Sequence, residues 1–169
     1  MRIRSLTWRR VYASHGCRVV VAGSLRDETT RTTVSLEAID YRGALTRPEV
    51  RLVLNEAAVG WLPLHHTPNH EKTWALKLGD YMAAGLPVVA SDLEYCASIV
   101  SRYDCGIIVG ADDANAHLNA LNYLLSNPDE AKRLGTNGKK AILEELNAEA
   151  YALKLRDLYE RLLCGIAIS

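Results

Sequence analysis

The sequence lacks several features that would place a protein in a class at once. No apolar run approaches the roughly 18 residues that a membrane-spanning helix needs. The N-terminal stretch MRIRSLTWRRVYASHG is basic but has no apolar segment, so it is not a signal peptide. Neither sign of charge is in excess, because 20 basic residues balance 20 acidic ones. This balance argues against a nucleic-acid partner held by bulk electrostatic attraction.

Common metal and catalytic motifs are also missing. The four cysteines occur without the CxxC spacing of a zinc or redox site, and with no export signal we expect reduced thiols in a cytoplasmic protein. There is no GxSxG elbow, no GxxxxGK[ST] loop and no GxGxxG after a predicted strand. His65, His66 and His70 lie close together, but their spacing on a loop is not a tetrahedral framework. We therefore expect no metal site, and no catalytic nucleophile is identified.

Short apolar runs alternate with longer amphipathic ones, a pattern that predicts parallel strands joined by helical crossovers. A chain of 169 residues has the length of one domain with a substantial core. We predict an α/β fold with a Rossmann-like, doubly wound parallel sheet of about five strands. The predicted strands are 18–22, 38–41, 59–62, 87–90 and 106–109. The predicted helices are 4–14, 48–56, 74–84, 95–103, 114–126, 129–145 and 148–163.

The most informative segment is KLGDYMAAGLPVVASD, at residues 77–92. Gly85 suits a helix C-cap, because glycine adopts the left-handed conformation at little cost. Pro87 follows where the helix cannot continue, and a short apolar strand begins there. Lys77 and Asp80 are three residues apart, so both side chains can lie on one face of the helix.

This segment closely resembles the K-L-x-E-Y-M-A-A-G-x-P-V-V-A-S signature of the C-terminal, donor-binding domain of GT-B retaining glycosyltransferases, often called glycosyltransferase group 1. The likeness runs from about residue 16 to residue 163, and five further strings occur in the family's order. They are RVVVAG (18–23), YRGAL (41–45), AAVGWLPL (57–64), CGIIVGADD (105–113) and NPDEAKRLGTNGKKAI (127–142). The resemblance implies a domain that binds a UDP- or GDP-sugar, with transfer of the sugar to a glycan, lipid or other acceptor. It implies no cofactor and no metal.

The resemblance also implies a larger enzyme. GT-B enzymes react in a cleft between two Rossmann-like domains, and this chain has room for one. It also begins after the domain's usual first strand and the basic, glycine-rich loop that follows. We therefore interpret residues 1–169 as a single nucleotide-sugar-binding domain that lacks its first strand and the N-terminal acceptor domain. We expect it to be inactive alone and cytoplasmic, with peripheral membrane association of the full enzyme left open.

Two residues of the signature are candidates for donor binding. In the family, a glutamate at the position of Asp80 accepts hydrogen bonds from the ribose hydroxyls, and a carboxylate can accept two such bonds. Lys77 would stabilise the charge that develops on the diphosphate leaving group. The alternatives are a solvent-facing helix carboxylate at Asp80 and a surface ion pair between the two residues.

Two further regions are predicted to contact the nucleotide sugar. The loop 65–73 joins a predicted strand end to a helix start, where ligands and phosphates bind in open α/β sheets. We expect its contacts from His70, Glu71 and Thr73, although Glu71 is one position out of register with the glutamate of many relatives. Gly23 and Gly43 would bring backbone close to the nucleotide, or simply form tight turns.

Two other functions remain open from the sequence. A non-catalytic nucleotide-sugar or partner-binding module would fit the absence of the basic diphosphate loop. A sugar-nucleotide epimerase of the same architecture is the other alternative.

Overall fold

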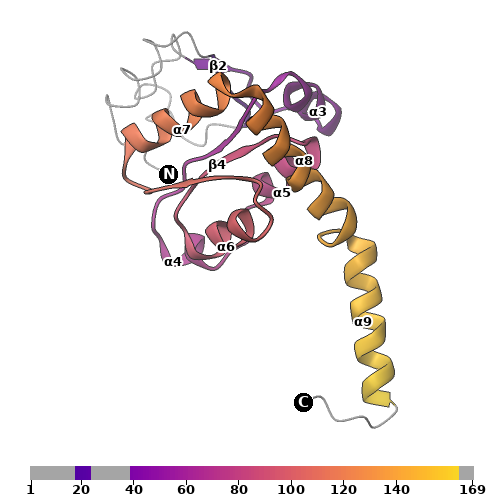
Figure 1. The fold of residues 1–169 in the computed structure, drawn as a ribbon. Helices are drawn as coiled ribbons and strands as arrows, with labels where there is room; N and C mark the ends of the chain where they lie inside the picture. The colour runs from indigo at the N-terminus through magenta and orange to yellow at the C-terminus, as the bar shows by residue number, and fades with distance from the viewer. Residues whose placement is uncertain (1–17, 24–38, 164–169) are drawn as a thin grey trace.

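The computed structural model describes residues 18–23 and 39–163 (Figure 1). The predicted helix 4–14 and the first residue of the predicted strand 38–41 lie outside these ranges. The described elements, in chain order, are β1 (Val19–Val21), β2 (Ile39–Tyr41), α3 (Arg47–Glu56), β3 (Gly60–Leu62), α4 (Pro68–Glu71), α5 (Leu76–Ala84), β4 (Val88–Ser91), α6 (Glu94–Arg102), β5 (Gly106–Val109), α7 (Ala114–Ser126), α8 (Pro128–Glu144) and α9 (Ala148–Leu163).

The five strands are parallel, and they form two sheets. β1 pairs with β2, whereas β4 lies between β3 and β5 in a three-stranded sheet. The predicted parallel α/β architecture is therefore confirmed. The division into two sheets was not foreseen. It arises because, within the described residues, no ladder of hydrogen bonds joins β1 to β3.

Helices cover both faces of the three-stranded sheet, as a doubly wound fold requires. Alternate residues of a strand point to opposite faces, and every residue of β4 is buried. On one face, Val88 and Ala90 pack in a cluster with Leu78 and Met82 of α5 and with residues of α6. On the other face, Val89 packs with Ala120 and Leu124 of α7 and with Leu134 of α8.

The predicted joint between helix and strand at Gly85 is confirmed. Gly85 is the C-cap of α5 in the left-handed conformation, with φ of 75°. Its N–H group donates to the backbone oxygens of Met82 and Tyr81, which satisfies carbonyls at the end of the helix. Because the chain turns within three residues, α5 leads directly into the buried strand β4.

The predicted helix 74–84 begins two residues later, at Leu76, and a short helix that the sequence did not predict precedes it. Four residues form α4, which carries Pro68 at its first position. Thr67 is its N-cap, and the side chain of Thr67 accepts a hydrogen bond of 3.2 Å from the backbone N–H of His70. A single helical turn has no amphipathic period, so hydrophobic spacing could not reveal it.

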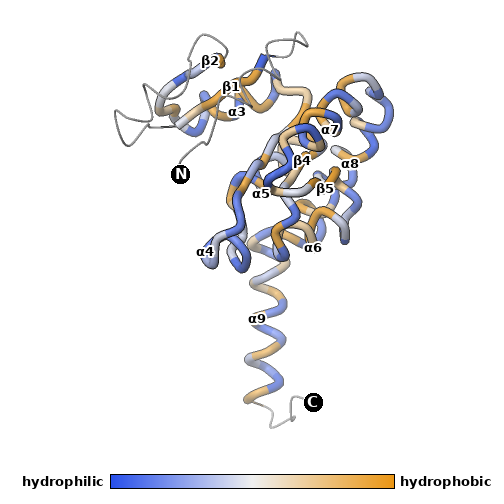
Figure 2. The backbone as a smooth tube through the Cα atoms, turned by 90° about the vertical axis from the view of Figure 1, so that its left-hand side faces the viewer, coloured by the Kyte–Doolittle hydropathy of each residue, from blue (hydrophilic) through white to orange (hydrophobic). Residues whose placement is uncertain are grey.

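The last helix, α9, has the predicted bounds and extends away from the body of the molecule (Figure 1 and Figure 2). Of its 16 residues, all but the half-buried Ala150 are exposed. Asn147 caps its start, because the side-chain oxygen of Asn147 accepts a hydrogen bond of 2.8 Å from the N–H of Ala150. In the described part of the chain, no helix has the length and apolar character that crossing a bilayer requires.

Candidate functional site

The candidate site lies at the C-terminal edge of the three-stranded sheet. The parallel register places the ends of β3, β4 and β5 at this edge. The loop 63–67 with α4, the turn after β4 and the loop 110–113 leave the sheet there. Crevices at this edge are where open α/β sheets bind ligands.

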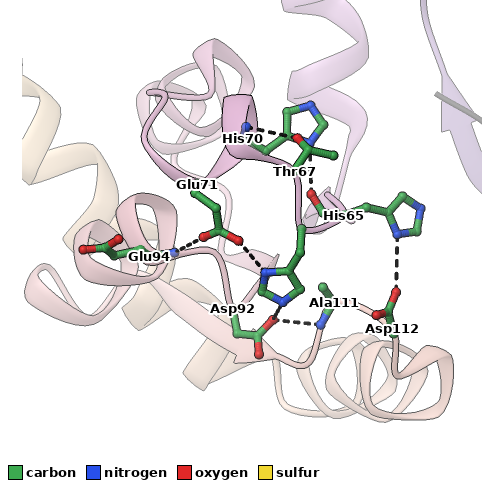
Figure 3. A network of polar contacts seen from close by, with 9 residues as sticks. His65, Thr67, His70, Glu71, Asp92, Glu94, Ala111 and Asp112 are labelled. Carbon is green, nitrogen blue, oxygen red and sulfur yellow. Dashed lines mark hydrogen bonds and ion pairs between the residues drawn. The ribbon is translucent and has the colours of Figure 1, made fainter.

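His66 lies between two carboxylates at this edge, those of Glu71 and Asp92. Figure 3 labels both acidic residues. The Nδ1 of His66 is 2.5 Å from Oε1 of Glu71, and its Nε2 is 3.3 Å from Oδ1 of Asp92. The hydrogen bond with Glu71 raises the pKa of His66, and the same contact lowers the pKa of Glu71. The imidazole therefore favours its charged form, in which both ring nitrogens donate.

The same carboxylates also bind backbone N–H groups. Glu71 Oε2 accepts a hydrogen bond of 3.3 Å from the N–H of Glu94, at the start of α6. The N-cap of that helix is Leu93, which has no side-chain oxygen, so Glu71 supplies the acceptor from another segment. Asp92 Oδ1 accepts a bond of 2.8 Å from the N–H of Ala111. Through Glu71 and Asp92, His66 therefore connects the loop 63–67 with α4, the turn after β4 and the loop 110–113.

Of the three residues predicted in the loop 65–73, two bond to the loop's own backbone. His70 Nδ1 lies 3.0 Å from the backbone oxygen of His65, and the Thr73 hydroxyl donates to the backbone oxygen of Asn69. Glu71 is engaged by His66 and α6, as described above. Their contact with a donor stays a prediction. The partner that the sequence missed is Asp92, which lies 26 positions after His66 and is brought to it only by the fold.

Lys77 and Asp80 are both exposed on α5. Within the described residues, no salt bridge joins Lys77 to Asp80, so the surface ion pair considered as an alternative is not formed here. The next residue, Tyr81, is half-buried, and its hydroxyl lies 3.3 Å from the backbone oxygen of Trp61. This contact fixes the helix against β3, while the two charged side chains remain open to solvent.

Gly23 and Gly43 lie just beyond the ends of β1 and β2, and the structure brings them together. The N–H of Gly23 donates to the backbone oxygen of Gly43 at 2.7 Å. Their φ values, +139° and +65°, are conformations that other residues rarely adopt. Among the described residues, a Cβ at either position would meet no atom within 4 Å. Gly23 is exposed and Gly43 is half-buried, and the Gly23 oxygen accepts a hydrogen bond of 2.6 Å from the Tyr41 hydroxyl. Their contact with the nucleotide stays a prediction.

A buried histidine beneath the site was also missed. His117 of α7 is fully buried, and Trp61 of β3 donates a hydrogen bond of 3.1 Å to its Nδ1. A neutral ring that accepts at Nδ1 carries its proton on Nε2, which lies 3.5 Å from the Ser91 hydroxyl. Burial lowers the pKa of His117, so the neutral ring is favoured. In the sequence, His117 lies at helical spacing from the apolar residues Ala120 and Leu124. This spacing indicates a buried helix face, but it does not reveal the contact between His117 and Trp61.

We predict that His117 makes the protein less stable in acid. The pKa is lower in the folded chain than in the unfolded chain, so the unfolded chain binds the proton first as the pH falls below about 6.5. The stability that neutral His117 contributes is therefore present above that pH and is lost below it. Urea unfolding between about pH 7.5 and 5 measures the change.

His117→Asn provides the comparison, because its side-chain oxygen can replace Nδ1 as the acceptor for Trp61. The free energy of unfolding of this variant should depend less on pH than that of the parent. His66 acts in the opposite direction, because its raised pKa favours the folded state in acid and this contribution is lost as the pH rises. His66→Gln should therefore steepen the loss in acid. An unchanged pH dependence in His117→Asn would contradict the assignment.

Among residues 18–23 and 39–163, no group of three or more His, Cys, Asp or Glu side chains is arranged to hold a metal ion. The contacts at the edge of the sheet are hydrogen bonds and ion pairs, which can orient loops and bind polar groups.

Comparison with known proteins places the chain among enzymes that transfer sugars. The family model described as Glycosyl transferases group 1 matches residues 5–127. An MMP alpha-(1->4)-mannosyltransferase from Mycolicibacterium hassiacum is 27% identical over 132 residues, which cover 78% of this chain and 31% of that protein.

Solved glycosyltransferase structures show the same fold. Sucrose-phosphate synthase from Thermosynechococcus elongatus superposes with a TM-score of 0.70 at 25% identity, over 88% of this chain and 38% of that one. WaaG, a glycosyltransferase involved in lipopolysaccharide biosynthesis, gives a TM-score of 0.61 at 14% identity, over 82% of this chain and 36% of that one. The chain thus spans about a third of the length of these relatives.

Proposed function

The chain belongs to the group 1 glycosyl transferase family, and from this premise we propose that it is the donor-binding portion of a retaining glycosyltransferase. It binds a UDP- or GDP-sugar, whose sugar is transferred to a glycan, lipid or other acceptor. The observation that carries the proposal is the segment from Lys77 to Asp92. It forms a capped helix and a buried strand, and it leaves Lys77 and Asp80 exposed without pairing to each other.

Each candidate residue has a role in this proposal. Asp80 accepts hydrogen bonds from the vicinal ribose hydroxyls, because an ionised carboxylate has acceptor sites for two donors. Lys77, one turn away, neutralises charge on the diphosphate. Gly23 and Gly43 let the nucleotide approach the backbone, because glycine carries no side chain that would hold it away.

The loop between β3 and α5 would position the sugar end of the donor. His70 and Thr73 hold the backbone of this loop, and Glu71 fixes it to α6 through the N–H of Glu94. Donor binding would then depend on the loop as a unit. We propose that no metal ion takes part and that the nucleotide sugar is the only small molecule required.

The names of the relatives support sugar transfer in general terms. One is a mannosyltransferase and another a sucrose-phosphate synthase, so the sugar and acceptor differ even among similar proteins. Because the chain spans about a third of their length, we propose that the acceptor side of the cleft comes from an N-terminal GT-B domain. We further propose that the full enzyme works in the cytoplasm.

We expect the 169-residue chain alone to show no transferase activity. A single domain does not enclose the reacting atoms or exclude water from them. Incubation of the purified chain with radiolabelled UDP- and GDP-sugars and candidate acceptors measures this. Transfer above the hydrolysis background would contradict the expectation.

The alternative function, a non-catalytic nucleotide-sugar-binding module, predicts the same inactivity. The two are separated by adding an N-terminal GT-B domain taken from a relative, either as a separate chain or fused. Transfer that appears on this addition supports the enzyme. The result that favours the module is nucleotide binding without any transfer, provided that the added partner domain has been shown to bind the acceptor.

A further inference from the structure

The imidazole of His66 uses both of its ring nitrogens on carboxylates of other segments. Its Nδ1 lies 2.5 Å from Oε1 of Glu71 on α4, and its Nε2 lies 3.3 Å from Oδ1 of Asp92, in the turn after β4. A ring that donates from both nitrogens is the charged imidazolium, which has no further N–H group for a ligand. The ring therefore acts on the protein and is not itself a donor-binding group.

The two carboxylates hold the start of α6 and the loop 110–113 at the same time. Glu71 Oε2 accepts a hydrogen bond of 3.3 Å from the N–H of Glu94, and Asp92 Oδ1 accepts one of 2.8 Å from the N–H of Ala111. Figure 3 shows how the labelled side chains of Glu71 and Asp92 converge from two different segments. One charged ring thus orients two acceptors, and each acceptor holds a backbone N–H group of a third segment.

The other charged groups near His66 are mostly acidic. Asp112 of the loop 110–113 adds a third carboxylate, and its Oδ1 lies 3.6 Å from Nδ1 of His65. The carboxyl group of Glu94 points away from the cluster (Figure 3). The hydrogen bond with Glu71 and the nearby negative charges raise the pKa of His66.

Loss of the proton from His66 would leave Glu71 and Asp92 without a positive charge between them. A neutral ring donates from one nitrogen only, so one of the two carboxylates loses its hydrogen bond. The two carboxylates would then repel each other, because like charges at short range are unfavourable. α4 would no longer be held against the turn after β4.

We propose that charged His66 is a positioning residue, which holds the loop between β3 and α5 in the arrangement that binds the nucleotide sugar and releases it on losing its proton. This inference rests on the proposed function, because His70, Glu71 and Thr73 of that loop are proposed to position the sugar end of the donor. Because the pKa of His66 is raised, the hold is complete below about pH 6.5 and is lost as the pH rises through the raised pKa.

The first test needs no nucleotide. NMR titration of the ring protons of His66 in the 169-residue chain gives the midpoint, and amide hydrogen exchange at Glu94 and Ala111 is then measured about one pH unit below and above it. His66→Gln retains N–H donors but carries no charge. His65→Gln is the matched control, because it makes the same change at the adjacent residue, whose partner Asp112 is 87% exposed and contributes little.

Below the midpoint, we expect His66→Gln to speed exchange of both amides about threefold to fivefold relative to the parent at the same pH. Above the midpoint the two proteins should exchange alike, and His65→Gln should resemble the parent at both pH values. The proposal is overturned by a midpoint below about 6.5, by unchanged exchange in His66→Gln, by an equal effect in His65→Gln, or by an effect that is the same on both sides of the midpoint.

The second test is calorimetric titration of UDP and GDP into the same proteins at the same two pH values. Below the midpoint, the parent should bind about threefold or more tightly than His66→Gln, and above it the two should bind alike. His66→Arg keeps its charge throughout, so above the midpoint it should bind more tightly than the parent.

The two tests separate this inference from the proposed function. A parent that binds a nucleotide with the same affinity as His66→Gln below the midpoint would overturn the role of His66 and leave the proposed function standing. A parent that binds neither nucleotide would contradict the proposed function, whereas the exchange rates would still decide whether charged His66 holds the loop.

Discussion

Replacing Gly135 with alanine is expected to lower the free energy of unfolding by about 3 kcal/mol. Gly135 lies on the face of α8 that packs against the end of α5, and its backbone approaches Gly85 directly. A Cβ at Gly135 would stand 2.1 Å from the backbone oxygen of Gly85 and 2.9 Å from its carbonyl carbon. Backbone at a left-handed cap cannot move aside, so the two helices would have to separate.

The expected loss exceeds the gain of about 1 kcal/mol that alanine brings to a helix interior. Thermal unfolding should show a fall in melting temperature of about 10 °C. Gly110→Ala is the matched control, because its Cβ would meet only the Asp113 side chain at an ordinary 3.6 Å. Its stability should stay within about 1 kcal/mol of the parent. A Gly135→Ala protein as stable as this control would show that the packing of α8 on the cap is not as described.

Asp80→Ala is expected to weaken binding of UDP or GDP by about 1.5–3 kcal/mol, which is a factor of roughly 10 to 150. The carboxylate lies exposed on α5, so the substitution removes acceptors for the ribose hydroxyls without disturbing the core. Asp80→Glu should bind at least nearly as well as the parent, because it restores the residue that the family signature carries.

The Lys77→Ala variant distinguishes binding of the diphosphate from binding of the ribose. An ammonium attracts phosphate charge, so this variant should lose more affinity for UDP than for uridine. Asp80→Ala should lose affinity for both, since both ligands carry the ribose. Equal losses for UDP and uridine in Lys77→Ala would contradict the assignment of Lys77 to the diphosphate.

Local sequence signals predicted the elements that carry these residues. Gly85 and Pro87 fixed the junction of α5 and β4 because cap and turn chemistry acts within a few residues. The start of α3 depends on an equally local contact, because Glu49 Oε2 accepts a hydrogen bond of 2.7 Å from the N–H of Thr46, three residues earlier. The bounds of α9 followed from its apolar period alone.

The contacts that organise the candidate site are long-range, and the sequence could not reveal them. His66 and Asp92 meet only because β3 and β4 are neighbours in the sheet. Trp61 and His117 are 56 positions apart, and their hydrogen bond depends on the packing of α7. The close approach of Gly135 to Gly85 depends in the same way on how α8 crosses α5. Contacts between residues that are far apart in the sequence cannot be predicted from the spacing of residue types.

Donor binding through α5 is tested most directly by calorimetric titration of UDP and GDP into the 169-residue chain and its Asp80→Ala variant. We predict weak binding of one of these nucleotides to the parent, and binding at least about tenfold weaker to Asp80→Ala. Equal affinity in the two proteins, or a folded parent that binds neither nucleotide, would contradict the account.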